Sequence, residues 1–171
     1  GTLFGVYAFL ESIGCRWFAP GISGEVLPII RNITIPPTNR LERPTFNYRG
    51  FSCFSPDTYK NPEWIDWMAK NRLNFIMINS EFYDDFNNTL EADIKLRNLS
   101  IGVRFEIKDS VINETKKIKD FLIRYPFINI LEIYDKDNRI ELLAKIADSI
   151  SDKAIYIRIN GKNVIKPMNM K

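Results

Sequence analysis

The chain contains no histidine among its 171 residues. This absence excludes, within this sequence, a Ser-His-Asp triad, a histidine general base and any metal site that needs an imidazole ligand. It has only two cysteines, Cys15 and Cys53, which are too few for a four-cysteine zinc site. A disulfide between them is one alternative, and two buried thiols are the more common state of such isolated cysteines.

Several other features are also scarce. The sequence has no Gly-x-Gly-x-x-Gly or Walker pattern, so nucleotide binding has no support, and we expect neither a cofactor nor a metal. The 24 basic residues are spread among 21 acidic ones, and the net charge of +3 forms no basic stripe of the kind that binds nucleic acid. The apolar run from Leu3 to Leu10 is too short to cross a bilayer and has no basic segment before it. We therefore expect neither a membrane nor a nucleic-acid partner.

Apolar residues, by contrast, are abundant. Hydrophobic side chains make up 45% of the sequence and aromatic ones 13%, which suffices for a packed core and argues against disorder. A chain of this length normally forms one domain or at most two small ones.

The first 45 residues predict short elements and a linker. Thr2 can cap a helix from Leu3 to Ser12, and Gly14 can close it in the left-handed conformation. Helical spacing predicts a buried face made of Leu3, Val6, Tyr7 and Leu10. Three short strands are expected at residues 16–18, 25–27 and 33–35. Residues 36–45 contain three prolines without apolar periodicity, which is typical of a linker.

From Phe46 onward, strands and helices alternate. Strands are expected at residues 46–54, 74–79, 101–107, 128–134 and 154–159, and no clear element in the tail from Gly161. Helices are expected at residues 63–71, 89–98, 113–125 and 138–149. This alternation predicts βαβ units and a parallel sheet. Five strands fit either an open doubly wound sheet or part of a barrel, because a closed (β/α) barrel needs about eight strands.

Four segments carry a resemblance to a known family. They are Gly1-Thr-Leu-Phe-Gly-Val-Tyr-Ala-Phe-Leu-Glu11, Gly14-Cys-Arg-Trp-Phe-Ala-Pro-Gly21, Gly24-Glu-Val-Leu-Pro28 and Pro44-Thr-Phe-Asn-Tyr-Arg-Gly-Phe51. In this order they resemble bacterial proteins with domain of unknown function 4838, which are relatives of the alpha-glucuronidases and, more distantly, of the beta-N-acetylhexosaminidases. The likeness extends through Phe51 and more loosely to Ile107.

The resemblance implies an α/β fold in which a small α+β domain precedes a (β/α) barrel. Residues 1–40 would then be the C-terminal part of the accessory domain with its linker, and residues 41–171 a partial barrel of about five parallel strands. It also implies a bacterial parent protein that is secreted or periplasmic. In the related glycosidases the catalytic carboxylates lie on later barrel strands, so the chain is expected to be a truncated piece without activity in isolation.

The candidate site residues follow the expected strands, at the edge where (β/α) proteins bind their ligands. The weak catalytic candidates are Glu106, Glu132 and Asp135. A glycosidase needs two carboxyl groups about 5–9.5 Å apart, and these residues could supply such a pair if their strands are adjacent. The alternative for these acids is an ordinary ion pair with a nearby base such as Arg104, Lys136 or Arg158.

The substrate-binding candidates are Arg49, Asp57 and Glu81. By resemblance, Arg49 corresponds to an arginine that binds sugar hydroxyls on the first barrel strand. The alternative is a structural ion pair, with Glu81 or Glu106 as the expected partner, because a guanidinium on a buried strand needs a counter-charge.

The resulting expectation is a fragment of a glycoside hydrolase-like protein that acts on or binds carbohydrate. The alternative is a non-catalytic carbohydrate-binding or structural remnant. Since an incomplete barrel leaves strand edges unpaired, the partners would be carbohydrate and either the rest of the barrel or another copy of the chain.

Overall fold

The computed structural model describes residues 2–29, 31–35, 41–53, 55, 61–128, 130–150, 156–159 and 162–164, without the side chains of residues 87–89, 156–158 and 162–164. These residues form two compact units. The first comprises Gly1–Phe51, Ser55–Phe75 and Thr89–Ser100, and the second Ser52–Phe54, Ile76–Asn88 and Ile101–Lys171. The predicted boundary between residues 1–40 and 41–171 stays a prediction.

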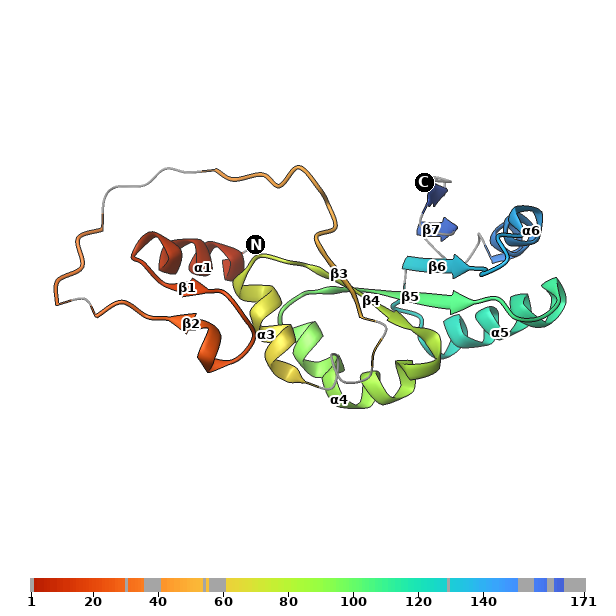
Figure 1. Ribbon diagram of the computed structural model, residues 1–171, viewed down its shortest axis with the longest axis horizontal. Coiled ribbons are helices and arrows are strands. Elements are labelled where there is room, and N and C mark those ends of the chain that lie inside the picture. Colours follow the sequence, from red (N-terminus) through yellow and green to blue (C-terminus); the bar gives the residue numbers. More distant parts are fainter. Residues whose placement is uncertain are drawn as a thin grey trace. The chain divides into compact units, whose positions relative to one another are not determined.

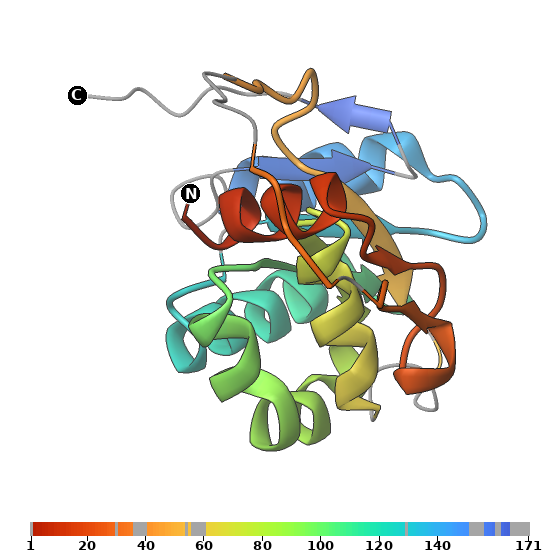
Figure 2. The same ribbon diagram turned by 90° about the vertical axis from the view of Figure 1, so that its left-hand side faces the viewer.

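The first unit begins with helix α1, Thr2–Ser12, shown in red in Figure 2. Gly14 follows it with φ of 102°, the left-handed conformation that its sequence position predicts. Strands β1, Arg16–Trp17, and β2, Glu25–Val26, pair antiparallel and are joined through the 3-10 turn η1, Ile22–Gly24.

Two predictions for this segment are wrong. Helix α1 has no buried residue, and Val6 is 49% exposed, because apolar side chains surround the helix while only part of it is packed against α3. Residues 33–35 form no strand in the described chain, since this short run between prolines finds no hydrogen-bonded partner among the residues described.

Helix α3, Pro62–Lys70, holds the N-terminal segment in place. It starts with Asn61 as cap, whose side chain accepts a hydrogen bond from the Glu63 N–H at 2.9 Å, and with proline at its first position. The Trp67 indole and the Asn71 side-chain amide both donate to the main-chain carbonyl of Trp17, at 3.0 and 3.1 Å. The hairpin of β1 and β2 is therefore fixed to α3 through the main chain of its buried tryptophan.

The second unit contains most of a six-stranded sheet with the order β3-β4-β5-β6-β7-β8 (Figure 1). The strands are β3, Gly50–Cys53; β4, Phe75–Asn79; β5, Ser100–Glu106; β6, Ile130–Tyr134; β7, Tyr156–Ile159; and β8, Lys162–Val164. Strands β5, β6 and β7 pair in parallel, and β8 pairs antiparallel with β7. The predicted α/β class with a parallel sheet is confirmed, whereas the incomplete barrel of about five parallel strands stays a prediction.

The connecting helices are α4, Tyr83–Leu96; α5, Val111–Arg124; and α6, Ile140–Ile150. The expected start of the second helix at Asn88 or Thr89 is wrong, because α4 begins six residues before Thr89 and includes both residues. The expectation of an unstructured tail is also wrong, since β8 lies within it. Strand β3 is shorter than the predicted 46–54, and Phe46 at its expected start is exposed.

One face of the sheet in the second unit packs an apolar core. Strand alternation places Val103 and Phe105 of β5 on the same side as Leu131 and Ile133 of β6, and all four are buried. The Phe105 ring meets Phe121 of α5 edge to face, with centroids 5.1 Å apart. This face is therefore the one that packs against helix α5. Both cysteines, Cys15 of the first unit and Cys53 of the second, are buried thiols, as expected.

Candidate functional site

The opposite face of β5 and β6 carries polar side chains toward the C-terminal ends of these strands. We use the name polar face for the side formed by Arg104, Glu106, Glu132 and Tyr134. The parallel register pairs Arg104 with Glu132 and Glu106 with Tyr134, so the four residues form two adjacent rows across β5 and β6. Glu106 and Glu132 thus lie on neighbouring strands, which is the condition under which the sequence could make them a pair.

An ion pair occupies the centre of the polar face. The Arg104 Nε donates to Glu132 Oε2 at 2.6 Å, and the Glu132 side chain is only 1% exposed. The Arg104 guanidinium also lies over the Tyr134 ring, with Cζ 5.0 Å from the centroid, within the range of a cation–π contact. The Arg104 side chain is about a quarter exposed. The guanidinium, and not the buried Glu132 carboxylate, is therefore the charged group of this pair that contacts solvent.

The register of the next strand, β7, adds a third position beside Arg104 and Glu132. Arg158 of β7 stands opposite Glu132 in the register, so the sequence places arginine on both neighbours of this glutamate. Arg104 was foreseen only as an ion-pair partner, and Tyr134 was not foreseen at all. The alternation Arg104-x-Glu106 and Glu132-x-Tyr134 is the signal that could have found the cluster, because such residues share one face of a strand.

The remaining two acids of this group stand at the strand ends. Glu106, the last residue of β5, is exposed and lies 3.3 Å from Lys108 Nζ. The loop that carries Lys108 is fixed by the buried Glu114 of α5, which accepts the main-chain N–H groups of Lys108 and Asp109 at 3.0 and 3.1 Å. The position of Lys108 is thus set by the start of the helix that follows β5.

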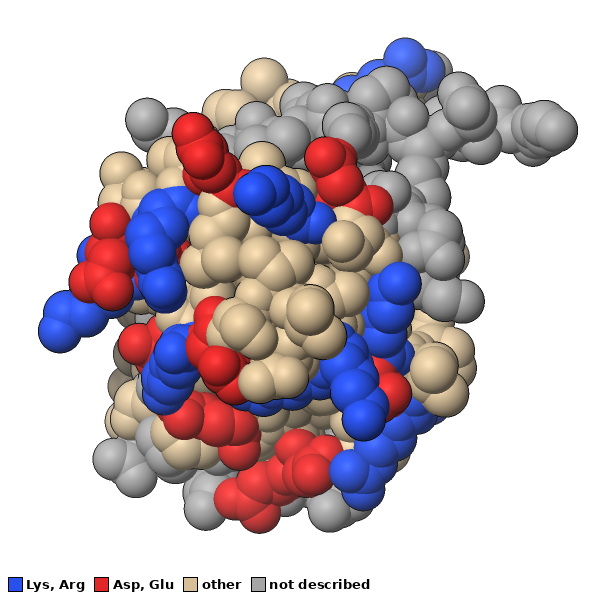
Figure 3. Space-filling model, turned by 90° about the vertical axis from the view of Figure 1, so that its right-hand side faces the viewer, with Lys and Arg blue, Asp and Glu red and all other residues tan. Residues whose placement is uncertain are grey.

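Asp135 directly follows β6 and is held by Arg139. Its two oxygens accept hydrogen bonds from the Arg139 guanidinium, both at 2.9 Å, and one of them also accepts from the Arg139 main-chain N–H at 2.7 Å. These hydrogen bonds lower the pKa of Asp135 to about 2. Figure 3 shows acidic and basic side chains interspersed on the face of the molecule that it draws, in keeping with such pairing.

The structure separates Glu81 from the polar face. Glu81 lies in the 3-10 turn η2, Ser80–Phe82, and lines a shallow hollow of about 320 Å³. Phe105 lines the same hollow, and in β5 its side chain points away from those of Arg104 and Glu106. Glu81 therefore cannot act together with Glu132 on one face. Asp57 lies outside the described residues.

Arg49 is held by polar groups of the first unit. Its guanidinium donates to the main-chain carbonyl of Arg72 at 3.1 and 3.2 Å and to that of Phe46 at 2.8 Å. Its main-chain N–H donates to the Asn74 side chain at 2.8 Å. Within the described part of the first unit, main-chain carbonyls and the Asn74 side chain are thus its partners, while the expected pairing with Glu81 or Glu106, which belong to the second unit, stays a prediction.

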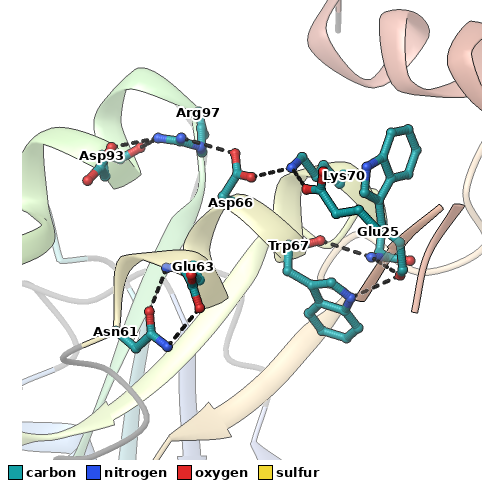
Figure 4. A network of polar contacts seen from close by, with 10 residues as sticks. Glu25, Asn61, Glu63, Asp66, Trp67, Lys70, Asp93 and Arg97 are labelled. Atoms are coloured by element: carbon teal, nitrogen blue, oxygen red, sulfur yellow. Dashed lines mark hydrogen bonds and ion pairs between the residues drawn. The ribbon is translucent and has the colours of Figure 1, made fainter. Parts of the chain in front are cut away.

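A ladder of five charges crosses the first unit (Figure 4). Lys70 pairs with Glu25 of β2 and with Asp66, while Arg97 of the segment after α4 pairs with Asp66 at 3.2 Å and Asp93 at 2.7 Å. Burial alone would raise the pKa of Asp66, but hydrogen bonds from Lys70 and Arg97 outweigh it and lower that pKa. Every charge here has a partner, which is typical of a structural clamp.

Two further properties of the described residues bear on the site. They contain no group of three or more cysteine, aspartate or glutamate side chains arranged to hold a metal ion. Among the helices in this part of the chain, none combines the length and the apolar character that crossing a bilayer requires.

Comparisons with known proteins give no relative. The chain matches no family model, no curated protein and no solved structure. The polar face must therefore be interpreted from its own geometry.

Proposed function

We propose that this chain binds carbohydrate on the polar face of its sheet and does not cleave it. The observation that carries the proposal is the central cluster, in which a buried Glu132 holds the Arg104 guanidinium over the Tyr134 ring. The partly exposed guanidinium gives paired donors for neighbouring hydroxyl groups, and an aromatic ring gives a surface for the C–H face of a sugar.

The position of the cluster in the fold agrees with this proposal. Tyr134 is the last residue of β6 and Glu106 the last of β5, so both stand at the C-terminal edge of parallel strands. Parallel α/β sheets bind their ligands outside this edge. A ligand that reaches Tyr134 there also meets Glu106 and Lys108.

The pairing of the acids favours binding over hydrolysis. A glycosidase holds one of its two carboxyl groups protonated as the general acid. Asp135, with a pKa of about 2, is ionised at neutral pH and cannot take that role. The other two candidates, Glu106 and Glu132, each face a cation at 3.3 and 2.6 Å. Each of the three carboxylates thus has a cation as its neighbour, which is typical of fixed polar contacts.

The resemblance to glycoside hydrolase-like proteins enters as part of the same proposal. We propose that the parallel strands of the second unit correspond to part of a (β/α) barrel and that the polar face corresponds to its interior. The parallel register of β5, β6 and β7 and the helix packed on the other face support this assignment.

The experiment is a binding measurement with matched variants. Oligosaccharides of neutral and acidic sugars are titrated calorimetrically into the chain, alongside Tyr134→Phe, Tyr134→Leu and Arg104→Lys. Tyr134→Phe keeps the ring and should keep the affinity, whereas Tyr134→Leu should lose about tenfold. Arg104→Lys keeps the charge but loses the fork and should also bind more weakly.

Two results would refute this proposal. One is binding that is equal in all variants, which would place the ligand elsewhere. The other is turnover of aryl glycosides above background that disappears in Glu106→Gln, Glu132→Gln or Asp135→Asn. That second result would make the chain an enzyme.

Self-association is a second candidate role, favoured by the sheet order. The order begins at β3 and ends at β8, and a strand at the end of a sheet presents unpaired main-chain groups to another chain. The end strands β3 and β8 are the two candidate edges for such an association. Light scattering that shows one copy at high concentration would exclude it.

A further inference from the structure

The hollow beside Glu81 has the character of a ligand site of its own. It lies wholly within the second unit, and its lining comes from η2, the start of α4, β5 and one stripe of α5. Its volume of about 320 Å³ falls at the small end of ligand pockets, which span roughly 300–1,000 Å³. The size suits one ring rather than a long chain.

Aromatic rings form the floor of this hollow. Phe121 is half-buried and contacts the rings of Phe105, Tyr83 and Tyr125, with centroid distances of 5.1, 5.2 and 4.9 Å. These three neighbours are buried, so they support Phe121 from below and hold its ring in one orientation. The part of Phe121 that stays exposed is a fixed apolar surface.

Polar groups of both kinds surround this floor. The donors are the Ser80 hydroxyl and the cations of α5, Lys117 and Arg124, which lie seven residues apart on the stripe that includes Phe121. Arg124 is shared with Asp84, at 3.4 Å, and Asp84 also accepts from the Tyr125 hydroxyl.

The hydrogen-bond acceptors around the floor of the hollow are two carboxylates. Glu81 and Asp120 line the hollow on opposite elements, and neither carboxylate makes a hydrogen bond or an ion pair within the described residues. Donors and acceptors therefore alternate around an aromatic floor, and the two carboxylates have capacity for further hydrogen bonds.

We infer that this hollow binds a single uncharged sugar ring, as a second carbohydrate site that is separate from the polar face. A pyranose has an apolar C–H surface that fits the Phe121 ring, and hydroxyl groups that both donate and accept. The carboxylates of Glu81 and Asp120 would repel a simple anion, and the cations of Lys117 and Arg124 would repel a simple cation. A neutral polyhydroxylated ring satisfies both kinds of rim group.

The test uses methyl pyranosides of neutral hexoses and saturation-transfer NMR on the whole chain. The variants are Glu81→Gln, an exposed position that should leave the fold unchanged, and Phe121→Leu, which keeps the apolar volume but removes the ring. Glu141→Gln, an exposed acid on α6 outside the hollow, is the matched control. Circular dichroism checks folding, and if Phe121→Leu does not fold, Glu81→Gln alone decides.

The expected result is a dissociation constant raised about tenfold in both hollow variants and unchanged in Glu141→Gln. Equal binding in Glu81→Gln and in the unmodified chain would overturn the inference, and so would the absence of saturation transfer to every pyranoside. Binding that Tyr134→Leu abolishes and Glu81→Gln leaves intact would also overturn it, while leaving the proposed function of the polar face in place.

Discussion

The buried carboxylate of Glu132 makes Arg104 a critical residue for stability. The substitution Arg104→Met removes the guanidinium. It leaves the Glu132 carboxylate, whose side chain is only 1% exposed, without this ion pair. Breaking such a buried pair costs about 3–5 kcal/mol, and we expect the lower end because Arg104 is a quarter exposed. Urea denaturation measures this loss in the free energy of unfolding.

Lys108→Met is the matched control for this prediction. The pair of Lys108 and Glu106 is exposed, with half or so of each side chain in contact with solvent, so its loss should cost less than about 1 kcal/mol. Equal destabilisation by the two substitutions would show that burial does not distinguish the pairs.

Asp135 offers a second prediction at a single position. Arg139→Gln removes the guanidinium that lowers the pKa of Asp135 to about 2, so this pKa should rise toward its ordinary value of 3.8. Because the pKa is lower in the folded state, the pair stabilises the fold above about pH 4 and loses this effect as the pH falls toward 2. An NMR titration of the carboxyl carbon that gives the same midpoint in both proteins would contradict the assignment.

Among the secondary-structure elements, β3 depends on a glycine. A Cβ on Gly50 would lie 1.6 Å from the main-chain oxygen of Phe75, which cannot move without shifting the backbone. Gly50→Ala should therefore destabilise the chain by at least the 1–3 kcal/mol that is typical of overpacking, so about 2 kcal/mol or more. Thermal or urea unfolding gives the value.

Gly5 is the opposite case and serves as its control. It lies within α1, and a Cβ there would meet no atom within 4 Å. Gly5→Ala should stabilise the helix by roughly 0.5–1 kcal/mol, because alanine loses less backbone entropy on folding. Similar effects at both glycines would show that the close approach at Gly50 is not real.

The charge ladder of the first unit predicts acid sensitivity. Since the pKa of Asp66 is lower in the folded state, its contacts with Lys70 and Arg97 stabilise the unit above about pH 4 and are lost at lower pH. Asp66→Asn should be less stable than the unmodified chain at pH 6, and the difference should shrink by pH 3. Unfolding midpoints that fall in parallel would count against this role.

Helix α4 explains where prediction from sequence succeeds and fails. The Asn-rich run before Leu90 suggested a cap, yet the helix continues through it from Tyr83. Tyr83, Phe86, Leu90 and Ile94 are all buried and repeat at helical spacing, so packing outweighs the weak propensity of the asparagines. Strand β8 was missed although Asn160-Gly161 favours a two-residue hairpin turn between Ile159 and Lys162.

For the molecule as a whole, the alternation of strands and helices was sufficient to predict the α/β class. The candidate site was predicted less well. Acids at strand ends were easy to identify, but the sequence could not assign their partners, such as Arg139 for Asp135. It also could not show that Glu81 and Glu132 belong to different surfaces, since that separation depends on the register of β5 and on helix packing.

A crystal structure of the chain soaked with an oligosaccharide would decide whether the polar face binds carbohydrate without cleaving it. The expected result is an intact sugar ring against Tyr134, with hydroxyl groups within hydrogen-bonding distance of Arg104 and Glu106. An empty polar face beside ordered sugar elsewhere on the molecule, or a ligand cleaved at Glu106, would contradict the proposal.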